Sequence, residues 1–364
     1  MVGTKVVLFG DPIVDIVAHV PASVLDDIGA EPGGCSLVSS EELEGLLSIP
    51  SVQATARRAL GGSAANVAKT LAVLSGDGDT SVCFCGMVGE DAEAQLVSSG
   101  LKEYDVLPAL LSTPQPTAAC LCLVTPDGQR TMRTCLAAAA QLQDPALVPG
   151  GLLEGARLVH CEGYCLYRGG FAEGVLRAAR RAGALASLDL ASLELVRGAW
   201  PAILRILEAG LVDIVFCNEQ EAAVVYKMAQ LGGDTVADHS DPLQAVLAFL
   251  SGRCRLAVVS LGEDGCVMRA RSGDEARGRA RPRQVADTVG AGDAFTAGVL
   301  WGMLGGHSLA GAALAGCEAG GVAVEAAGAE PGVAALTALR ASLAGLLPEH
   351  GSTGRCALDV LNER

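Results

Sequence analysis

Short apolar runs rich in β-branched residues alternate along the chain with stretches that suit helices, and this alternation constrains the fold most. The strand-like runs are residues 5–9, 81–85, 158–161, 185–189, 214–217 and 256–260. The helix-compatible stretches are residues 66–74, 171–182, 200–209, 219–231 and 242–251. This alternation is typical of an α/β fold, so we predict a doubly wound, mostly parallel sheet flanked by helices.

Two regions interrupt the alternation, at about residues 15–60 and 107–137. In the second region, the apolar run 117–124 precedes the turn Pro126-Asp127-Gly128, which indicates a hairpin. We interpret both regions as parts of a small β lid over the sheet. With 364 residues, the chain suits one α/β domain over residues 1–345, followed by a C-terminal tail at 346–364.

The composition favours a large core and a small-molecule partner. Hydrophobic residues make up 50% of the chain and charged residues 18%, enough for a sizeable core. The formal net charge is −15, and no Lys/Arg run offers the basic surface that nucleic acid or an anionic membrane needs. A charge-rich stretch at 269–283 is interpreted as a solvated hairpin, with phosphate binding as its alternative. We therefore expect neither a nucleic acid nor a membrane as partner.

The cysteines and the N-terminus favour a cytoplasmic protein. Thirteen cysteines are scattered without regular spacing, which fits a reduced compartment better than a disulfide scaffold. Cys83 and Cys85 would share one strand face, but no second Cys/His pair at zinc-site spacing accompanies them. The chain enters an apolar strand at once, without a leader, although a mature organelle protein that has lost its targeting peptide would look the same.

Residues 294–317 contain no Asp, Glu, Lys or Arg, and their length alone would suit a membrane span. Gly305-Gly306-His307-Ser308 interrupts the segment with a helix stop and a new N-cap. We therefore predict two short buried helices.

The segment Asp287-Thr-Val-Gly-Ala-Gly-Asp293 carries the strongest chemical signal. A glycine turn that opens an apolar helix leaves N–H groups at the positive end of the helix dipole, where an anion can bind. Asp293 could accept a proton from an attacking hydroxyl there, while the amides of residues 291–293 stabilise charge on the transferred group. The alternative is a simple glycine turn with an ordinary first-turn Asp.

This segment resembles the Asp-Thr-x-Gly-Ala-Gly-Asp signature of the ribokinase-like, or PfkB, family of carbohydrate and nucleoside kinases. Three more motifs resemble that family, in the family's order: Gly61-Gly-Ser-Ala-Ala-Asn66, Asn218-Glu-Gln-Glu221 and Ser260-Leu-Gly-Glu-Asp-Gly265. Together the four motifs span most of the chain. No P-loop and no regular dinucleotide-binding glycine motif follows the first strand, which weakens P-loop and dehydrogenase alternatives.

The resemblance implies a ribokinase-like fold and transfer of the γ-phosphate of Mg·ATP to a hydroxymethyl group. It implies Asp293 as the base and an anion hole formed by Gly290, Ala291 and Gly292. The residues implied to bind ATP are Asn218, Ser260, Gly262, Gly265 and Gly292. Asn218 and Glu221 would hold Mg²⁺ through water, and a monovalent cation such as K⁺ is compatible with the family. The expected partners are ATP and a small-molecule acceptor, with the protein as a monomer or homodimer.

The residues alone support a magnesium site but leave alternatives open. Asn218 and Glu221 lie three apart at a strand-to-helix junction, on one helix face at the carboxyl edge of the sheet. A carboxylate and an amide there suit Mg²⁺, which keeps several waters and shares its coordination with phosphates. Glu221 could equally be an exposed helix residue, and Asn66 could simply bond local backbone.

The acceptor side is expected to contain Asp11, Asp15, Gly61, Gly62, Asn66 and Tyr164. In the resemblance, the position of Asp15 bonds vicinal hydroxyls, and a carboxylate suits this role because it can accept from two hydroxyls at once. Asp11 could equally be a loop or cap residue. Arg130 and Arg133 could approach the phosphates or face water.

Residues 33–38, 129–132 and 162–164 are similar to adenosine-kinase-like members of the family, so adenosine is the expected acceptor. A purine usually stacks on an aromatic ring, yet the chain has only 6 Phe, 4 Tyr and 2 Trp. Tyr164 and Tyr167 are the candidates for stacking. A ribose- or fructose-type sugar kinase and a catalytically silent scaffolding member of the family stay as alternatives.

Overall fold

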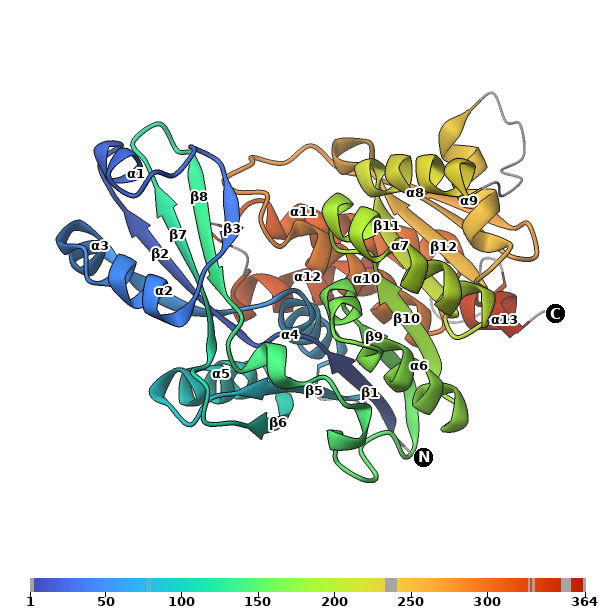
Figure 1. The fold of residues 1–364 in the computed structure, drawn as a ribbon. Coiled ribbons are helices and arrows are strands. Elements are labelled where there is room, and N and C mark those ends of the chain that lie inside the picture. Colours follow the sequence, from blue (N-terminus) through green and yellow to red (C-terminus); the bar gives the residue numbers. More distant parts are fainter. Residues whose placement is uncertain are drawn as a thin grey trace.

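A nine-stranded sheet forms the body of the protein (Figure 1). The computed structural model describes residues 3–76, 78, 80–232, 241–326, 328, 331–347 and 355–362. The strand order is β14-β13-β12-β11-β10-β9-β1-β5-β6. The strands are β1 (Thr4–Phe9), β5 (Thr80–Val88), β6 (Val106–Ser112), β9 (Ala156–Cys161), β10 (Leu185–Asp189), β11 (Ile214–Asn218), β12 (Leu256–Ser260), β13 (Cys266–Ala270) and β14 (Glu275–Gly278).

The sheet is doubly wound, as predicted. Neighbouring strands from β6 through β1 to β12 are parallel, whereas β13 and β14 add an antiparallel edge. From β1 the chain first adds β5 and β6 on one side and later adds β9 to β12 on the other. The carboxyl ends of β1 and β9 therefore mark the switch point, where open α/β sheets bind ligands.

Two helical layers cover the sheet because successive strand residues point to opposite faces. Val6 and Leu8 belong to one apolar core and Val7 and Phe9 to a second. Helices that contribute to the first core are α4 (Ser63–Ser75), α5 (Ala92–Glu103), α10 (Ala291–Leu304), α11 (Leu309–Ala323), α12 (Val333–Leu346) and α13 (Ala357–Asn362). The second core receives α6 (Phe171–Arg181), α7 (Leu193–Glu208), α8 (Glu219–Leu231) and α9 (Pro242–Ser251).

A second sheet of five strands stands beside the first (Figure 1), and it confirms the predicted β lid. Its order is β3 (Cys35–Leu37), β8 (Arg130–Cys135), β7 (Ala118–Val124), β2 (Ile13–His19) and β4 (Arg57–Gly61). The lid also carries α1 (Ser23–Asp27), α2 (Ser40–Leu47) and α3 (Pro50–Thr55). The predicted lid boundary at residue 107 is wrong, because β6 pairs with β5 in the main sheet.

Several element ends follow from capping side chains. The helix predicted at 200–209 begins earlier, at Leu193, because the hydroxyl of Ser192 accepts from Leu195 N at 3.1 Å. The apolar segment 294–317 forms two helices, α10 and α11, and Ser308 caps the second. In the described parts of the chain, no helix has the length and apolar character that crossing a membrane requires.

The described ranges also contain the short 3₁₀ helices η1 (Ala139–Gln141), η2 (Pro145–Leu147), η3 (Gly163–Tyr167) and η4 (Gly262–Asp264). The charged stretch 269–283 contains the turn between β13 and β14, so the predicted hairpin is present as part of the main sheet. In the predicted tail, Ala357 and Leu361 of α13 are buried in the first core. Residues 348–354 and 363–364 of that tail lie outside the described residues.

Candidate active site

A cavity of about 350 Å³ lies at the carboxyl edge of the main sheet, where the ends of β10, β11 and β12 face the start of α10. The lining includes seven of the residues singled out from the sequence: Tyr164, Asn218, Glu221, Ser260, Gly290, Gly292 and Asp293. The structure thus brings motifs from three distant parts of the chain to one site. Gly262 and Gly265 lie in the turn after β12 and do not line this cavity.

The carboxylate of Asp293 is fixed by two donors from the start of α4. Ser63 Oγ donates to Asp293 Oδ1 at 2.7 Å, and Asn66 Nδ2 donates to Asp293 Oδ2 at 2.9 Å. The side-chain amide of Asn66 therefore donates to Asp293 and not to local backbone. Its own Oδ1 is buried without a hydrogen-bond partner among the described residues. An unpartnered buried acceptor of this kind is suited to a ligand hydroxyl.

The environment of Asp293 makes its proton affinity unusual for an aspartate. Burial raises the pKa of Asp293, while the hydrogen bonds from Ser63 and Asn66 and the positive charge of Lys69 oppose that rise. Lys69 is itself buried, and its Nζ donates to the carbonyl of Leu60 at 3.0 Å. A raised carboxylate pKa strengthens the group as a base.

The N-terminus of α10 contains the residues that the sequence predicts to form an anion site. Gly290 caps the helix in a left-handed conformation, φ 76°, which favours glycine. The Ala291 N–H donates to the Thr288 carbonyl at 3.3 Å, whereas the N–H groups of Gly292 and Asp293 have no acceptor among the described residues. A Cβ at Gly292 would meet no atom within 4 Å, so the space beside this residue is open.

Asn218 and Glu221 bind each other in a capping box. Asn218 Nδ2 donates to Glu221 Oε1 at 2.7 Å, and the backbone N–H of Asn218 donates to Oε2 at 2.9 Å. Glu221 is buried, so the alternative of an exposed helix residue is wrong. Burial raises its pKa, against the effect of the bonds from Asn218.

Asp189, at the end of β10, lines the same cavity and was not expected from the sequence. Its Oδ1 accepts from Ala191 N at 2.8 Å, and its Oδ2 accepts from Thr296 Oγ1 at 3.2 Å. Burial, together with the negative charges of Glu221 and Asp293, raises its pKa to about 7. The cavity thus gathers three carboxylates that repel one another, and a bound cation would relieve that repulsion.

These carboxylates fit a hydrated Mg²⁺ rather than a fully protein-ligated metal. Among the described residues, no group of three or more His, Cys, Asp or Glu side chains is arranged to hold a metal ion directly. A Mg²⁺ that keeps its waters and binds phosphates suits such a site, because it needs few direct protein ligands.

The predicted acceptor-side residues meet where the lid joins the main sheet. Asp15 of β2 packs against the α-carbon of Gly61 in the adjacent strand β4, which leaves no room for a side chain there. Gly62 has φ 97°, and its α-carbon packs on the carbonyl of Asp11. Two of the four chain connections between the lid and the main sheet therefore touch each other.

Asp11 forms a structural contact beside the cavity. Its carboxylate forms a buried ion pair with Arg168, and its side chain does not line the cavity. Burial lowers the pKa of Arg168 to about 10. The reading of Asp11 as a loop residue thus gains support from the structure.

Glu162, at the end of β9, links the lid connection to α4. Its Oε1 accepts from Asp11 N at 2.7 Å, and its Oε2 accepts from Ala64 N at 2.8 Å. Burial raises the pKa of Glu162 well above its ordinary value, against the effect of the Ala64 N–H. Glu162 lies beside the site without lining the cavity, so we assign it to positioning the start of α4.

Two further expectations have definite outcomes. Arg130 of the lid pairs with Asp287, in the loop before the Gly-Ala-Gly turn, which connects lid and anion site. Tyr164 lines the cavity, whereas Tyr167 is 57% exposed and does not line it.

Two of the site residues to which the sequence analysis assigned no role share one signal that could have revealed them. Asp189 and Glu162 each end or directly follow a parallel strand, at the edge where ligands bind. Ser63 and Thr296 carry no such signal, because their position depends on how α4 and α10 approach each other.

Comparison with known proteins agrees with this geometry. The model of the pfkB family carbohydrate kinases matches residues 42–335, more than half of the chain. An adenosine kinase from Schizophyllum commune is 25% identical over 328 residues, which cover 84% of this chain and 90% of that protein.

Two solved structures are similar over nearly their whole length. A probable sugar kinase from Rhizobium etli CFN 42 has 30% identity and a TM-score of 0.79, covering 95% of this chain and 100% of that one. An adenosine kinase from Sinorhizobium meliloti has 30% identity and a TM-score of 0.78, covering 93% of this chain and 99% of that one. The chain therefore belongs to the pfkB family of carbohydrate kinases, and it is an ATP-dependent kinase whose acceptor is an alcohol group.

Proposed function

We propose that the protein transfers the γ-phosphate of Mg·ATP to a hydroxymethyl group of a nucleoside, with adenosine as the preferred acceptor. One observation carries the proposal: the Asp293 carboxylate is held by Ser63 and Asn66 at the cavity, in the first turn of the helix whose N-terminus is open. A base and an anion site placed side by side are what phosphate transfer to a hydroxyl requires.

In the proposed reaction, Asp293 accepts the proton of the acceptor hydroxyl as its oxygen attacks the γ-phosphorus. The O–P bond to the acceptor forms while the bond to the β-phosphate oxygen breaks, so ADP leaves. The N–H groups of Gly292 and Asp293, which have no acceptor among the described residues, point to where the transferred group would carry its charge. Ser63 and Asn66 keep the carboxylate oriented during the proton transfer.

Mg²⁺, when bound with ATP, neutralises charge on the phosphates and helps to orient them. Asn218 and Glu221 would hold its waters, because their side chains line the cavity and already form one hydrogen-bonded unit. Asp189 adds a third carboxylate to the same cavity, which strengthens the negative field there.

The choice of adenosine rests on the similar relatives and on the aromatic lining. An adenosine kinase is among the similar curated proteins and among the similar structures, and Tyr164, Phe216 and Phe295 line the cavity. These three rings provide aromatic surface for a purine, although the chain has few aromatic residues overall. A ribose- or fructose-type sugar is the second candidate, because the probable sugar kinase has the same sequence identity to this chain, 30%, as the adenosine kinase from Sinorhizobium meliloti.

Three finer expectations accompany the proposal. Dependence on K⁺ is checked by replacing KCl with choline chloride in the activity assay. Asp287, the carboxylate before the glycine turn, already pairs with Arg130, so no place for K⁺ is assigned. The state of monomer or homodimer is checked by analytical ultracentrifugation. A cytoplasmic location is checked by fractionating the source cells.

The decisive experiment is a panel of acceptors, namely adenosine, 2′-deoxyadenosine, ribose and fructose, with Mg·ATP. We expect the highest kcat/KM for adenosine. The 2′-deoxy compound should lose at least about tenfold, because it lacks a hydroxyl that Asp15 and Asn66 would bond. Asp15→Ala should then remove the difference between the two nucleosides.

Two tyrosines provide a matched pair for the base. Tyr164→Ala should raise the KM for adenosine and leave that for a free sugar unchanged, whereas Tyr167→Ala, away from the cavity, should change neither. If the protein phosphorylates ribose or fructose and does not phosphorylate adenosine, the result would assign a sugar kinase instead. No turnover of any acceptor, with ATP still bound, would support the silent scaffolding alternative.

A further inference from the structure

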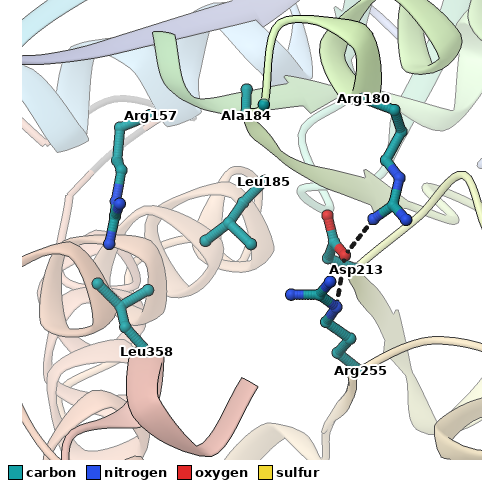
Figure 2. A pocket seen from close by; sticks show the side chains of 8 residues that line it. Arg157, Arg180, Ala184, Leu185, Asp213, Arg255 and Leu358 are labelled. Atoms are coloured by element: carbon teal, nitrogen blue, oxygen red, sulfur yellow. Dashed lines mark hydrogen bonds and ion pairs between the residues drawn. The ribbon is translucent and has the colours of Figure 1, made fainter. Parts of the chain in front are cut away.

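A second cavity, of about 380 Å³, lies at the opposite edge of the main sheet (Figure 2). Its residues come from the amino ends of the parallel strands: Arg157 lies in β9, Leu185 begins β10, Asp213 precedes β11 and Arg255 precedes β12. Arg180, near the end of α6, Ala184 before β10 and Leu358 of α13 also line the cavity (Figure 2). No step of the proposed reaction uses this edge.

Asp213 anchors two of the three arginines. Its side chain is only 2% exposed, and its Oδ1 faces Arg180 Nη1 at 2.9 Å and Arg255 Nε at 3.0 Å. The other oxygen, Oδ2, accepts from Ala186 N at 2.8 Å. The carboxylate is therefore fully engaged, and it fixes both guanidinium groups at the rim of the cavity.

Positive charge exceeds negative charge in this cavity. Three guanidinium groups line it against the single carboxylate of Asp213. Arg157 is exposed and forms no hydrogen bond or ion pair with another described residue, and Figure 2 shows it across Leu185 from the other two arginines. Arg180 and Arg255 are 40% and 34% exposed, and each guanidinium has five donors of which the pairing with Asp213 uses few.

Such a cluster is unexpected on a chain of net charge −15. Three arginines would repel one another if their only role were to neutralise one aspartate, and Arg157 is not needed for that role. Guanidinium groups bind phosphate through paired N–H donors, more strongly than neutral donors do. The two surplus positive charges match a phosphate monoester, which carries about two negative charges at neutral pH.

We propose that this cavity is a second ligand site, which binds a small phosphate monoester through Arg157, Arg180 and Arg255. Leu185 and Leu358 form an apolar part of the wall, against which the organic part of the ester packs (Figure 2). The cavity volume of about 380 Å³ is in the range of small-molecule sites. Inorganic phosphate could make the same contacts with the arginines, but it has no organic group to pack against the two leucines.

The test is isothermal titration calorimetry of the full chain with phenyl phosphate and, separately, with inorganic phosphate. We expect saturable binding of both, tighter for phenyl phosphate and weaker at high salt. Arg157→Gln should weaken both ligands by about 10- to 100-fold, the effect of losing one charge-assisted contact. Leu358→Ala should weaken phenyl phosphate alone.

Arg157 is the informative position, because its removal breaks no bond with the described residues and leaves the carboxyl-edge cavity intact. Arg181→Gln is the matched control, since Arg181 is an exposed neighbour of Arg180 that does not line the cavity. The difference between the two variants separates this site from any binding near Asp293. Equal affinity in Arg157→Gln and Arg181→Gln would overturn the proposal, as would the lack of saturable binding by wild-type protein.

Discussion

Asp293→Asn separates the chemistry of the site from its architecture. Asp293 accepts hydrogen bonds from Ser63 at 2.7 Å and from Asn66 at 2.9 Å. In the variant, the amide oxygen can still accept from Asn66, and the new amide nitrogen can donate to the Ser63 hydroxyl, which can act as an acceptor. The start of α4 should therefore keep its position against α10, while the base is gone.

The size of the expected loss follows from the proposed role of Asp293 as the base. Positioned general bases contribute about 10²- to 10⁴-fold to rates, so kcat should fall by at least about 100-fold. Binding of ATP should change little, because the amides of Gly292 and Asp293 belong to the backbone and remain in the variant.

Stability should respond in the opposite direction. The raised pKa of Asp293 means that the folded protein holds this proton more tightly than the unfolded chain does. Its contribution to stability is therefore present below the unfolded pKa and is lost as the pH rises through the folded pKa. Asparagine cannot ionise, so the Tm of the variant at neutral pH should equal or exceed that of the wild type.

Three measurements check this reasoning: steady-state turnover, calorimetric ATP binding and thermal unfolding at pH 7.5. Ser63→Ala is a useful control, because it removes one donor and keeps the carboxylate; its kcat should fall less. A variant Asp293→Asn with more than about a tenth of wild-type turnover would remove Asp293 from its role. A large fall in Tm would show instead that the ionised carboxylate stabilises the fold.

Three further predictions concern the neighbours of this base and the packing behind it. Glu221→Gln should raise the Mg²⁺ concentration needed for half-maximal activity, since an amide holds the hydrated ion less strongly than a carboxylate; an unchanged titration would leave Glu221 as a capping residue only. Asp189→Asn removes a carboxyl group whose pKa is raised to about 7 by burial and by the charges of Glu221 and Asp293, so a change of kcat/KM near pH 7 should disappear from the pH profile; a profile that keeps this change would contradict the assignment of that titration to Asp189. Gly316→Ala would place a Cβ 2.6 Å from Val299 Cγ2 in the contact between α11 and α10, which should cost about 1–3 kcal/mol in urea unfolding. Gly345→Ala, on an exposed helix position with no atom within 4 Å of the new Cβ, is the control and should be neutral or stabilising.

Much of the fold could be predicted because local signals mark the ends of its elements. The bounds of α8 and α9 were predicted correctly, and each begins after a capping side chain, Asn218 or Asp241. The lid was harder, since its strands β2, β4 and β7 pair over long sequence distances. The run at 106–112 gives no local indication of which of the two sheets it joins.

Some parts of the site could likewise be predicted from the sequence and others could not. Motifs identified Asp293, Asn218 and Glu221, because the chemistry there depends on adjacent residues. The hydrogen bond from Ser63 to Asp293 joins residues 230 positions apart, so it follows from the packing of two helices and from no local pattern. The ion pair of Arg168 with Asp11 could not be predicted from the sequence for the same reason.

The contact between Gly62 and the carbonyl of Asp11 has a mechanical consequence. Residues 10–12 connect β1 to β2, and Gly62 connects β4 to α4, so two of the four chain crossings between the two sheets touch each other at this point. A movement of the smaller sheet that displaced Gly62 would also move Ser63, the next residue, whose hydroxyl donates to Asp293 Oδ1. The orientation of the smaller sheet and the hydrogen bonding of the Asp293 carboxylate would then be mechanically coupled.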